Sequence, residues 1–137
     1  MKTEGRLMDM LAGYAASEWG GDCAADGSIT LAVGDIAECT IANDDKAPSL
    51  ILVKDVVNDN GGTAVAGDWT LTAAGYDPAN PQTGTYALSE SGPDGYSLTS
   101  LTCSNSGVAQ VTSVTLALGE DVTGTVVNDD VAPSWIL

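Results

Sequence analysis

A stretch of 14 residues recurs in this chain in a similar, not identical, form, and the second copy follows the first at a distance of 85 residues. The first copy occupies residues 39–52 and the second occupies residues 124–137. A self-similarity at a fixed period of domain size indicates an array of modules. The repeat therefore predicts an incomplete module at residues 1–45, which is the C-terminal half of a repeat. A complete module follows at residues 46–130, and the first strand of a following module at residues 131–137.

Short apolar segments alternate with turn signals throughout the complete module. Groups of Gly, Pro, Asn and Asp separate six segments that are rich in Val, Thr, Leu and Ser, a pattern typical of strands and turns. The predicted strands are 48–57, 68–74, 85–91, 96–103, 108–118 and 121–128. Without helical periodicity, this pattern predicts an all-β chain that folds as a small Ig-like β-sandwich. Trp69 and Leu71 share one face of their strand and are predicted to lie in its core.

The incomplete module shows the same pattern, with strands predicted at residues 28–33 and 36–43. Cys23 and Cys39 bracket this pair of strands, which favours a disulfide formed in an oxidising compartment. Such a bridge would contribute about 3 kcal/mol in the chain-entropy model. The alternative is two small buried thiols. Cys103 keeps the place of the first cysteine in the complete module, but glycine replaces the second, so Cys103 has no partner.

Charge and composition exclude several functional classes. Four basic residues against nineteen acidic ones give a net charge of −15, which repels nucleic acid and anionic lipid. The chain has no His, the usual proton carrier and metal ligand of hydrolases. The sequence contains no run of about 18 apolar residues, the length that would predict a membrane span. We therefore expect a non-enzymatic protein that binds no nucleic acid and does not insert into a membrane.

Three polar residues occur where strand alternation predicts apolar side chains: Lys54, Glu90 and Asn128. Their apolar neighbours on the same faces are Leu50, Leu52 and Val56 for the lysine, Tyr86 and Leu88 for the glutamate, and Val122 and Val126 for the asparagine. Buried charges must pair or become neutral, and a neutral amine beside a polarised carboxamide can attack it and release ammonia. The alternative places the lysine at a sheet edge, the glutamate at a turn and the asparagine in a linker.

The complete module resembles the prealbumin-fold, collagen-binding-protein B-type repeats, or SpaA-like domains, of bacterial surface proteins and pili. That family has a Lys in the first strand, a Glu ahead of a Pro-x-Gly-Tyr turn, and an Asn or Asp at the end of the last strand. The matching residues are Lys54, Glu90 and Asn128. The resemblance covers residues 46–130 well and residues 12–45 in part. It implies a prealbumin-like sandwich with a self-formed isopeptide bond between Lys54 and Asn128, in which Glu90 is the proton shuttle.

Each copy of the repeated stretch contains a pair of aspartates, and these pairs suggest a cation site. Asp44 and Asp45 precede the complete module, and Asp129 and Asp130 end it. Clustered carboxylates supply the oxygen ligands that calcium prefers, and nearby side chains could add further oxygens: Asp55, Asn58, Asp59 and Asn60. Calcium bound at the two acidic pairs would stiffen the junctions between modules, although no cofactor is required by the chemistry above. The alternative is a pair of solvated acidic turns.

The two ends of the chain predict how it assembles. A half-module at the N-terminus lacks its first strand, while the C-terminal tail supplies an isolated first strand that contains Trp135, Ile136 and Leu137. Unpaired strand edges are liabilities unless they find a partner. Strand addition between copies would give a head-to-tail filament of identical subunits, unless the chain is a fragment of a longer array.

Together with the repeat, the resemblance implies a structural module of an extracellular bacterial fibre, pilus or adhesin stalk at the cell surface. The self-formed cross-link is the only chemistry expected of it. The alternative function is a calcium-stiffened adhesin or a ligand-binding surface module.

Overall fold

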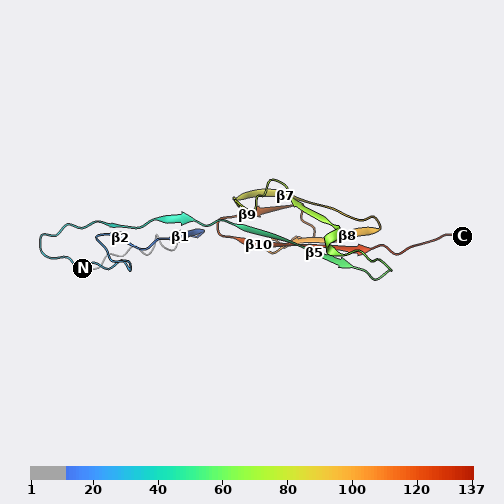
Figure 1. Ribbon diagram of the computed structural model, residues 1–137, viewed down its shortest axis with the longest axis horizontal. Coiled ribbons are helices and arrows are strands. Elements are labelled where there is room, and N and C mark those ends of the chain that lie inside the picture. Colours follow the sequence, from blue (N-terminus) through green and yellow to red (C-terminus); the bar gives the residue numbers. More distant parts are fainter. Residues whose placement is uncertain (1–11) are drawn as a thin grey trace.

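The computed structural model describes residues 12–137, which form an elongated molecule (Figure 1). A narrow hairpin lies at one end, a β-sandwich lies in the middle, and residues 131–137 extend from the other end. Residues 1–11, the start of the predicted incomplete module, lie outside the described residues.

Two three-stranded sheets form the sandwich. The first sheet has the order β5 (Ser49–Val57), β10 (Asp121–Asp130), β8 (Tyr96–Cys103). The second has the order β6 (Thr70–Ala73), β7 (Gly84–Ser91), β9 (Ser113–Leu116). The last strand, β10, lies in the centre of its sheet, parallel to β5 and antiparallel to β8. The predicted all-β sandwich is confirmed, and its first and last strands are direct neighbours.

Alternating burial along β10 builds the core. Every second residue from Val122 to Asp130 is buried, because successive side chains of a strand point to opposite faces. The central apolar cluster consists of Tyr86, Cys103, Val114, Leu116 and Val122. Of the two predicted core residues, Trp69 is buried and Leu71 is half-buried. The inward face of β10 therefore lines the core, and any polar residue on this face needs a hydrogen-bond or ion-pair partner.

Two strands of the sandwich are shorter than the sequence predicts. β6 begins only at Thr70, because a 3-10 turn, Ala66–Asp68, precedes it. The strand expected at residues 108–118 is limited to β9. Residues 104–112 instead cross from one sheet to the other, starting with a turn in which Ser106 N–H donates to the Cys103 carbonyl.

The N-terminal hairpin differs more strongly from the prediction. Its strands are β1 (Tyr14–Ala16) paired with β4 (Asn43–Asp45), and β2 (Gly20–Gly21) paired with β3 (Cys39–Thr40). The prediction of a strand at residues 28–33 was wrong, and that at residues 36–43 was right only at residues 39–40 and at residue 43. In the sandwich the equivalent of residues 28–31 is β9, which pairs with β7. The described part of the hairpin has no counterpart of β7, so this segment has nothing to pair with.

Candidate functional site

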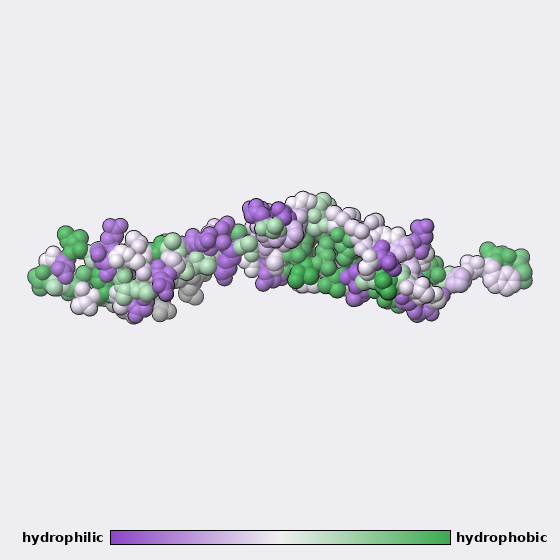
Figure 2. Space-filling model, in the orientation of Figure 1, coloured by the Kyte–Doolittle hydropathy of each residue, from purple (hydrophilic) through white to green (hydrophobic). Residues whose placement is uncertain are grey.

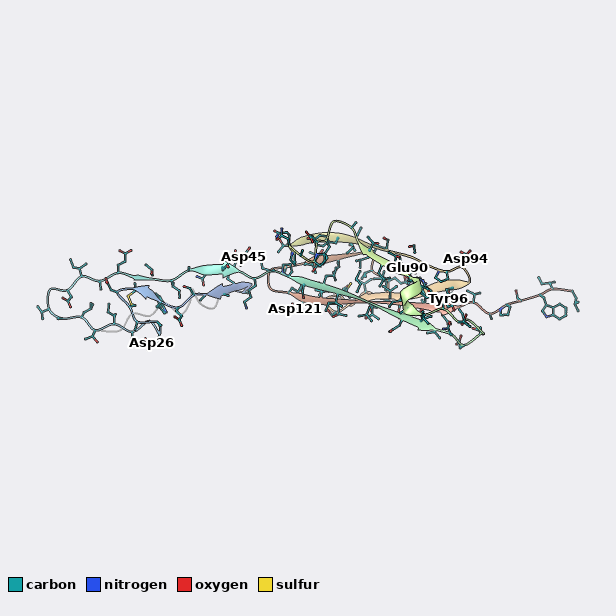
Figure 3. The ribbon with its side chains drawn as sticks, in the orientation of Figure 1. Asp26, Asp45, Glu90, Asp94, Tyr96 and Asp121 are labelled. Carbon is teal, nitrogen blue, oxygen red and sulfur yellow. A yellow bond between two sulfur atoms is a disulfide. The ribbon has the colours of Figure 1, made fainter. Side chains whose placement is uncertain are left out.

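Lys54, Glu90 and Asn128 meet inside the sandwich. Lys54 lies on β5 and Asn128 on β10, which are adjacent parallel strands, and Glu90 reaches them from β7 in the facing sheet. Figure 3 shows Glu90 near the end of the sandwich that also holds Tyr96, away from the hairpin. The three polar residues that the sequence places on apolar faces are thus brought together from both sheets.

Each of the three side chains contacts the other two. Lys54 Nζ lies 3.1 Å from Glu90 Oε2 and donates a hydrogen bond to Asn128 Oδ1. Asn128 Nδ2 donates to Glu90 Oε1 at 2.9 Å. The two oxygens of one carboxylate therefore hold the amine and the carboxamide nitrogen at the same time, while the amine lies against the carboxamide oxygen.

The cluster is largely shielded from water. The side chain of Lys54 is 4% exposed and that of Glu90 is 17% exposed. The Lys54 ammonium lies 4.5 Å from the centre of the Trp69 ring, which in turn packs edge-to-face against Tyr96 at 5.1 Å. A buried charge without partners would be very unstable, so the ion pair and the ring face both stabilise the lysine here.

Residues that contact Trp69 and Tyr96 hold these two rings at this site. Any side chain at Gly92 would overlap the Trp69 ring, so the turn after β7 can close over the tryptophan only with glycine at this position. Tyr96 is held by its hydroxyl, which donates to Asn58 Oδ1 at 2.5 Å and accepts from Ala64 N–H at 3.0 Å. The sequence analysis placed Trp69 in the core but did not predict its contact with Lys54, because strand alternation says nothing about contacts between sheets.

This geometry matches a condensation between an amine and a carboxamide. The nucleophile (Lys54), the electrophile (Asn128) and a carboxylate able to carry protons between them (Glu90) are in mutual hydrogen-bonding contact. Holding reactants in a near-attack arrangement converts a bimolecular reaction into an intramolecular one. Their burial excludes water as a competing nucleophile.

A second cluster, made of acidic residues, lies at the C-terminal end of β10. Carboxylate oxygens of Asp59, Asp129 and Asp130 lie within 4.8 Å of one another. Asp130 accepts backbone hydrogen bonds from Asp59, Asn60 and Gly62 at 3.1, 2.9 and 2.7 Å. Burial alone would raise the pKa of Asp130, but these N–H donors lower it to about 2. Burial and the neighbouring Asp59 carboxylate raise the pKa of Asp129.

The four predicted calcium ligands do not lie together. Asp44 and Asp45 are exposed on β4, and Figure 3 shows Asp45 at the junction between hairpin and sandwich. Asp129 and Asp130 are the last residues of β10, a strand that ends at the opposite end of the sandwich (Figure 1). The structure adds Asp59 to the second pair. Each acidic pair must therefore be considered by itself.

Cysteine pairing distinguishes the two parts of the molecule. Cys23 and Cys39 form a disulfide, with their Cα atoms 5.2 Å apart. Cys103 is a free, buried thiol whose pKa is raised by burial. It lies opposite Gly124, as Gly21 lies opposite Cys39 in the hairpin. The structural counterpart of Cys103 is therefore Gly21, and the prediction that Cys103 keeps the place of Cys23 was wrong.

The C-terminal tail makes no strand in this structure. Residues 131–137 are all exposed, and Trp135, Ile136 and Leu137 are 79%, 95% and 104% exposed. These apolar side chains have no cover within the described part of the chain.

Comparison with known proteins gives one match. The SpaA-type family model described as a prealbumin-like fold domain matches residues 45–126, which is more than half of the chain. Neither the curated proteins nor the solved structures include a match. Within residues 12–137, no helix has the length and apolar character needed to cross a membrane. The matched segment covers β5 to most of β10, and so contains Lys54 and Glu90 and ends just before Asn128.

Proposed function

The chain belongs to the SpaA-type family of prealbumin-like fold domains, and from this we propose that it is a structural module of an extracellular bacterial fibre, pilus or adhesin stalk. The observation that carries the proposal is the buried contact among Lys54, Glu90 and Asn128. We propose that these residues form a covalent isopeptide bond without an added enzyme or cofactor.

The position of this contact suits a protein under tension. The chain enters the sandwich through β5 and leaves it through β10, and these strands lie side by side in parallel. Lys54 and Asn128 are 74 residues apart in sequence. A bond between them would carry a pulling force directly from the first strand to the last, so the residues between them would not unfold under load.

The proposed reaction begins when Glu90 accepts a proton from the Lys54 ammonium, which leaves a neutral amine and a carboxylic acid. The amine attacks Asn128 Cγ to form the new C–N bond and gives up a second proton. This proton and the Glu90 proton both pass to the carboxamide nitrogen, which leaves as ammonium when the old C–N bond breaks, and Glu90 returns to a carboxylate. Asn128 Nδ2 already points at Glu90, where it can receive that proton.

Intact mass of the reduced chain tests this proposal. We expect the parent chain to weigh about 17 Da less than its sequence, the mass of one ammonia lost in amide formation. Lys54→Ala should have the full sequence mass, and so should Glu90→Gln immediately after synthesis. Lys46→Ala is the matched control, because it removes an exposed lysine and should keep the deficit. A parent chain of full mass would contradict the cross-link.

We further propose that the modular division at residues 1–45, 46–130 and 131–137 supports assembly of identical copies head to tail. The hairpin offers an incomplete strand set, and the tail offers exposed apolar residues. The expected partner is a second copy of the chain at the bacterial surface. Size measurement of the parent chain over a range of concentrations tests this: growth with concentration supports it, and a constant monomer contradicts it.

A calcium-stiffened surface module is the second candidate. It is favoured by the convergence of Asp59, Asp129 and Asp130 and by Asp129 Oδ1, which is buried and has no hydrogen-bond partner among the described residues. A divalent cation would relieve the repulsion between Asp59 and Asp129. Calcium should then raise the melting temperature of the parent but not of Asp129→Asn. Equal melting curves with calcium and with chelator would exclude this candidate.

A further inference from the structure

The paired strands of the hairpin reproduce the β8–β10 pair of the sandwich. The corresponding residue pairs are Tyr14–Asp45 and Tyr96–Asp130 at one end, and Gly21–Cys39 and Cys103–Gly124 at the other. In sequence, residues 39–45 repeat the region 124–130 of β10. The hairpin is therefore the same antiparallel pair as in the sandwich, built in the same register.

One strand of the sandwich has no counterpart in the hairpin. In the sandwich, β5 lies along the free side of β10. Within the described residues, β3 and β4 have no strand on that side. Asn128 Oδ1 accepts a hydrogen bond from Lys54 of β5, but the equivalent atom of Asn43 is buried without a described partner. Both observations mark the place where a strand like β5 would lie.

The chain itself contains a segment of the required sequence. Residues 132–137 repeat residues 47–52, which lead into and form the first half of β5. Exposed apolar side chains occur at both ends of the molecule: Leu31, Val33 and Ile36 at the hairpin end, and Trp135, Ile136 and Leu137 in the tail. Figure 2 shows hydrophobic surface at both ends of the elongated molecule. Neither end can cover the other within one molecule.

We propose that residues 132–137 of a second copy approach the side of β3 opposite to β2, where residues 134–137 pair in parallel with residues 36–39. The pairing ends at Cys39, so the donated segment covers the first part of this open side and does not reach Asn43 on β4. This inference rests on the proposed head-to-tail assembly and specifies its register. In the sandwich, Ser49, Leu50, Ile51 and Leu52 lie opposite Asp121, Val122, Thr123 and Gly124. The repeat transfers this register to the pairs Ser134–Ile36, Trp135–Ala37, Ile136–Glu38 and Leu137–Cys39.

Two local consequences follow from this register. Residues 36–38, which form no strand in the isolated molecule, extend β3 by pairing with the donated tail. A Cβ atom at Gly124 would lie 2.8 Å from Leu52 Cδ2, so the cysteine at the equivalent position 39 leaves less room for Leu137. Leu137 therefore packs against the Cys23–Cys39 disulfide rather than in the space that Leu52 fills.

Cross-linking between two variants tests the register. One copy carries Ser134→Cys and the other carries Ile36→Cys, and both carry Cys103→Ala to remove the free thiol. Oxidation of the mixture should give a covalent heterodimer. The control replaces Ile36→Cys by Glu38→Cys, on the same strand face but two residues away. We expect about tenfold more heterodimer from the first pair, because parallel pairing fixes which residues lie opposite each other.

The outcomes separate this inference from the assembly proposal. If the parent assembles, loses assembly when residues 132–137 are deleted, and shows equal cross-linking with both pairs, the register is wrong but head-to-tail assembly stands. A parent that stays monomeric at every concentration overturns both. Amide protection of residues 36–39 that does not depend on concentration would also overturn the inference, because a segment of the same molecule would then occupy the site.

Discussion

The hairpin at residues 14–45 and the sandwich at residues 49–130 contain equivalent strand pairs, but different contacts hold those pairs in place. In the hairpin, a disulfide between Cys23 and Cys39 joins the two arms. In the sandwich, Cys103 faces Gly124 and no disulfide forms, and Lys54, Glu90 and Asn128 instead link the first strand, the last strand and the facing sheet. Equivalent strand pairs are thus stabilised by a disulfide in the hairpin and by a buried polar cluster in the sandwich.

The difference follows from which strands are present. A lysine such as Lys54 requires β5, and a carboxylate such as Glu90 requires β7, and residues 12–45 contain no equivalent of either strand. Within these described residues the apolar side chains also have no opposite sheet to bury them, and Val33 and Ile36 remain exposed. A disulfide needs only two cysteines on neighbouring chain segments. It is therefore the covalent link available to the incomplete unit.

Breaking the polar cluster should have the largest effect. Lys54→Ala leaves Glu90 buried without its cation and prevents the cross-link, and removing one partner of a buried ion pair costs about 3–5 kcal/mol. We expect a large fall in the melting temperature of the sandwich, measured by calorimetry. Lys46→Ala, the exposed control, should leave it nearly unchanged. Equal melting temperatures for the two variants would show that the cluster does not hold the sandwich together.

Breaking the disulfide should affect the hairpin alone. Cys23→Ala with Cys39→Ala opens a loop of 16 residues, for which the chain-entropy model gives about 3 kcal/mol of lost stabilisation. Amide exchange should become faster in β2 and β3, while β5 and β10 stay protected. Loss of protection in β10 as well would mean that the hairpin and the sandwich fold as one unit.

A third variant adds a disulfide to the sandwich between two directly opposite residues of β8 and β10. The Cβ atom introduced by Gly124→Cys would lie 3.6 Å from Cys103 Sγ, close enough for a disulfide after a small shift of the Leu52 side chain. We expect this bridge to form and to offset about 1–2 kcal/mol of the loss caused by Lys54→Ala, below the entropic maximum because of that shift. Melting of the combined variant with and without reductant measures the effect. No change on reduction would show that a disulfide across β8 and β10 cannot replace the polar cluster.

The smallest effect should come from acidification. The pKa of Asp130 is lowered to about 2. Its contribution to the free energy of unfolding is therefore complete above the ordinary pKa of 3.8 and is lost as the pH falls through about 2. The raised pKa of Asp129 acts in the opposite sense, since its protonation relieves repulsion from Asp59. The amide of Gly62, which donates to Asp130, should lose its hydrogen bond over this range, as followed by its NMR shift. A shift change centred above pH 3.8 would contradict this assignment.

Much of the site could be predicted from alternation alone. The parity of Lys54, Glu90 and Asn128 along their strands indicated that all three point inward, and turn signals gave the bounds of β8 correctly. The contact of Trp69 with Lys54 could not be predicted in this way, because it depends on how the two sheets are placed. The strand expected at residues 28–33 failed because pattern describes a strand's faces but not whether a neighbour exists to pair with it.

The acidic cluster shows the same limit. The sequence indicates Asp129 and Asp130 as a pair and Asp59 among several possible further ligands, but the fold of the loop after β5 decides that Asp59 lies beside them. The backbone donors to Asp130 belong to that loop and leave no signal in the side-chain pattern.

Peptide mapping of the reduced parent chain is the most direct test of the difference between the two regions. After proteolysis, we expect one branched species that joins a β5 peptide to a β10 peptide through Lys54 and Asn128, lighter than their sum by about one ammonia. The peptides containing Cys23 and Cys39 should separate on reduction. Recovery of the β5 and β10 peptides as separate, unmodified species would show that the sandwich has no cross-link.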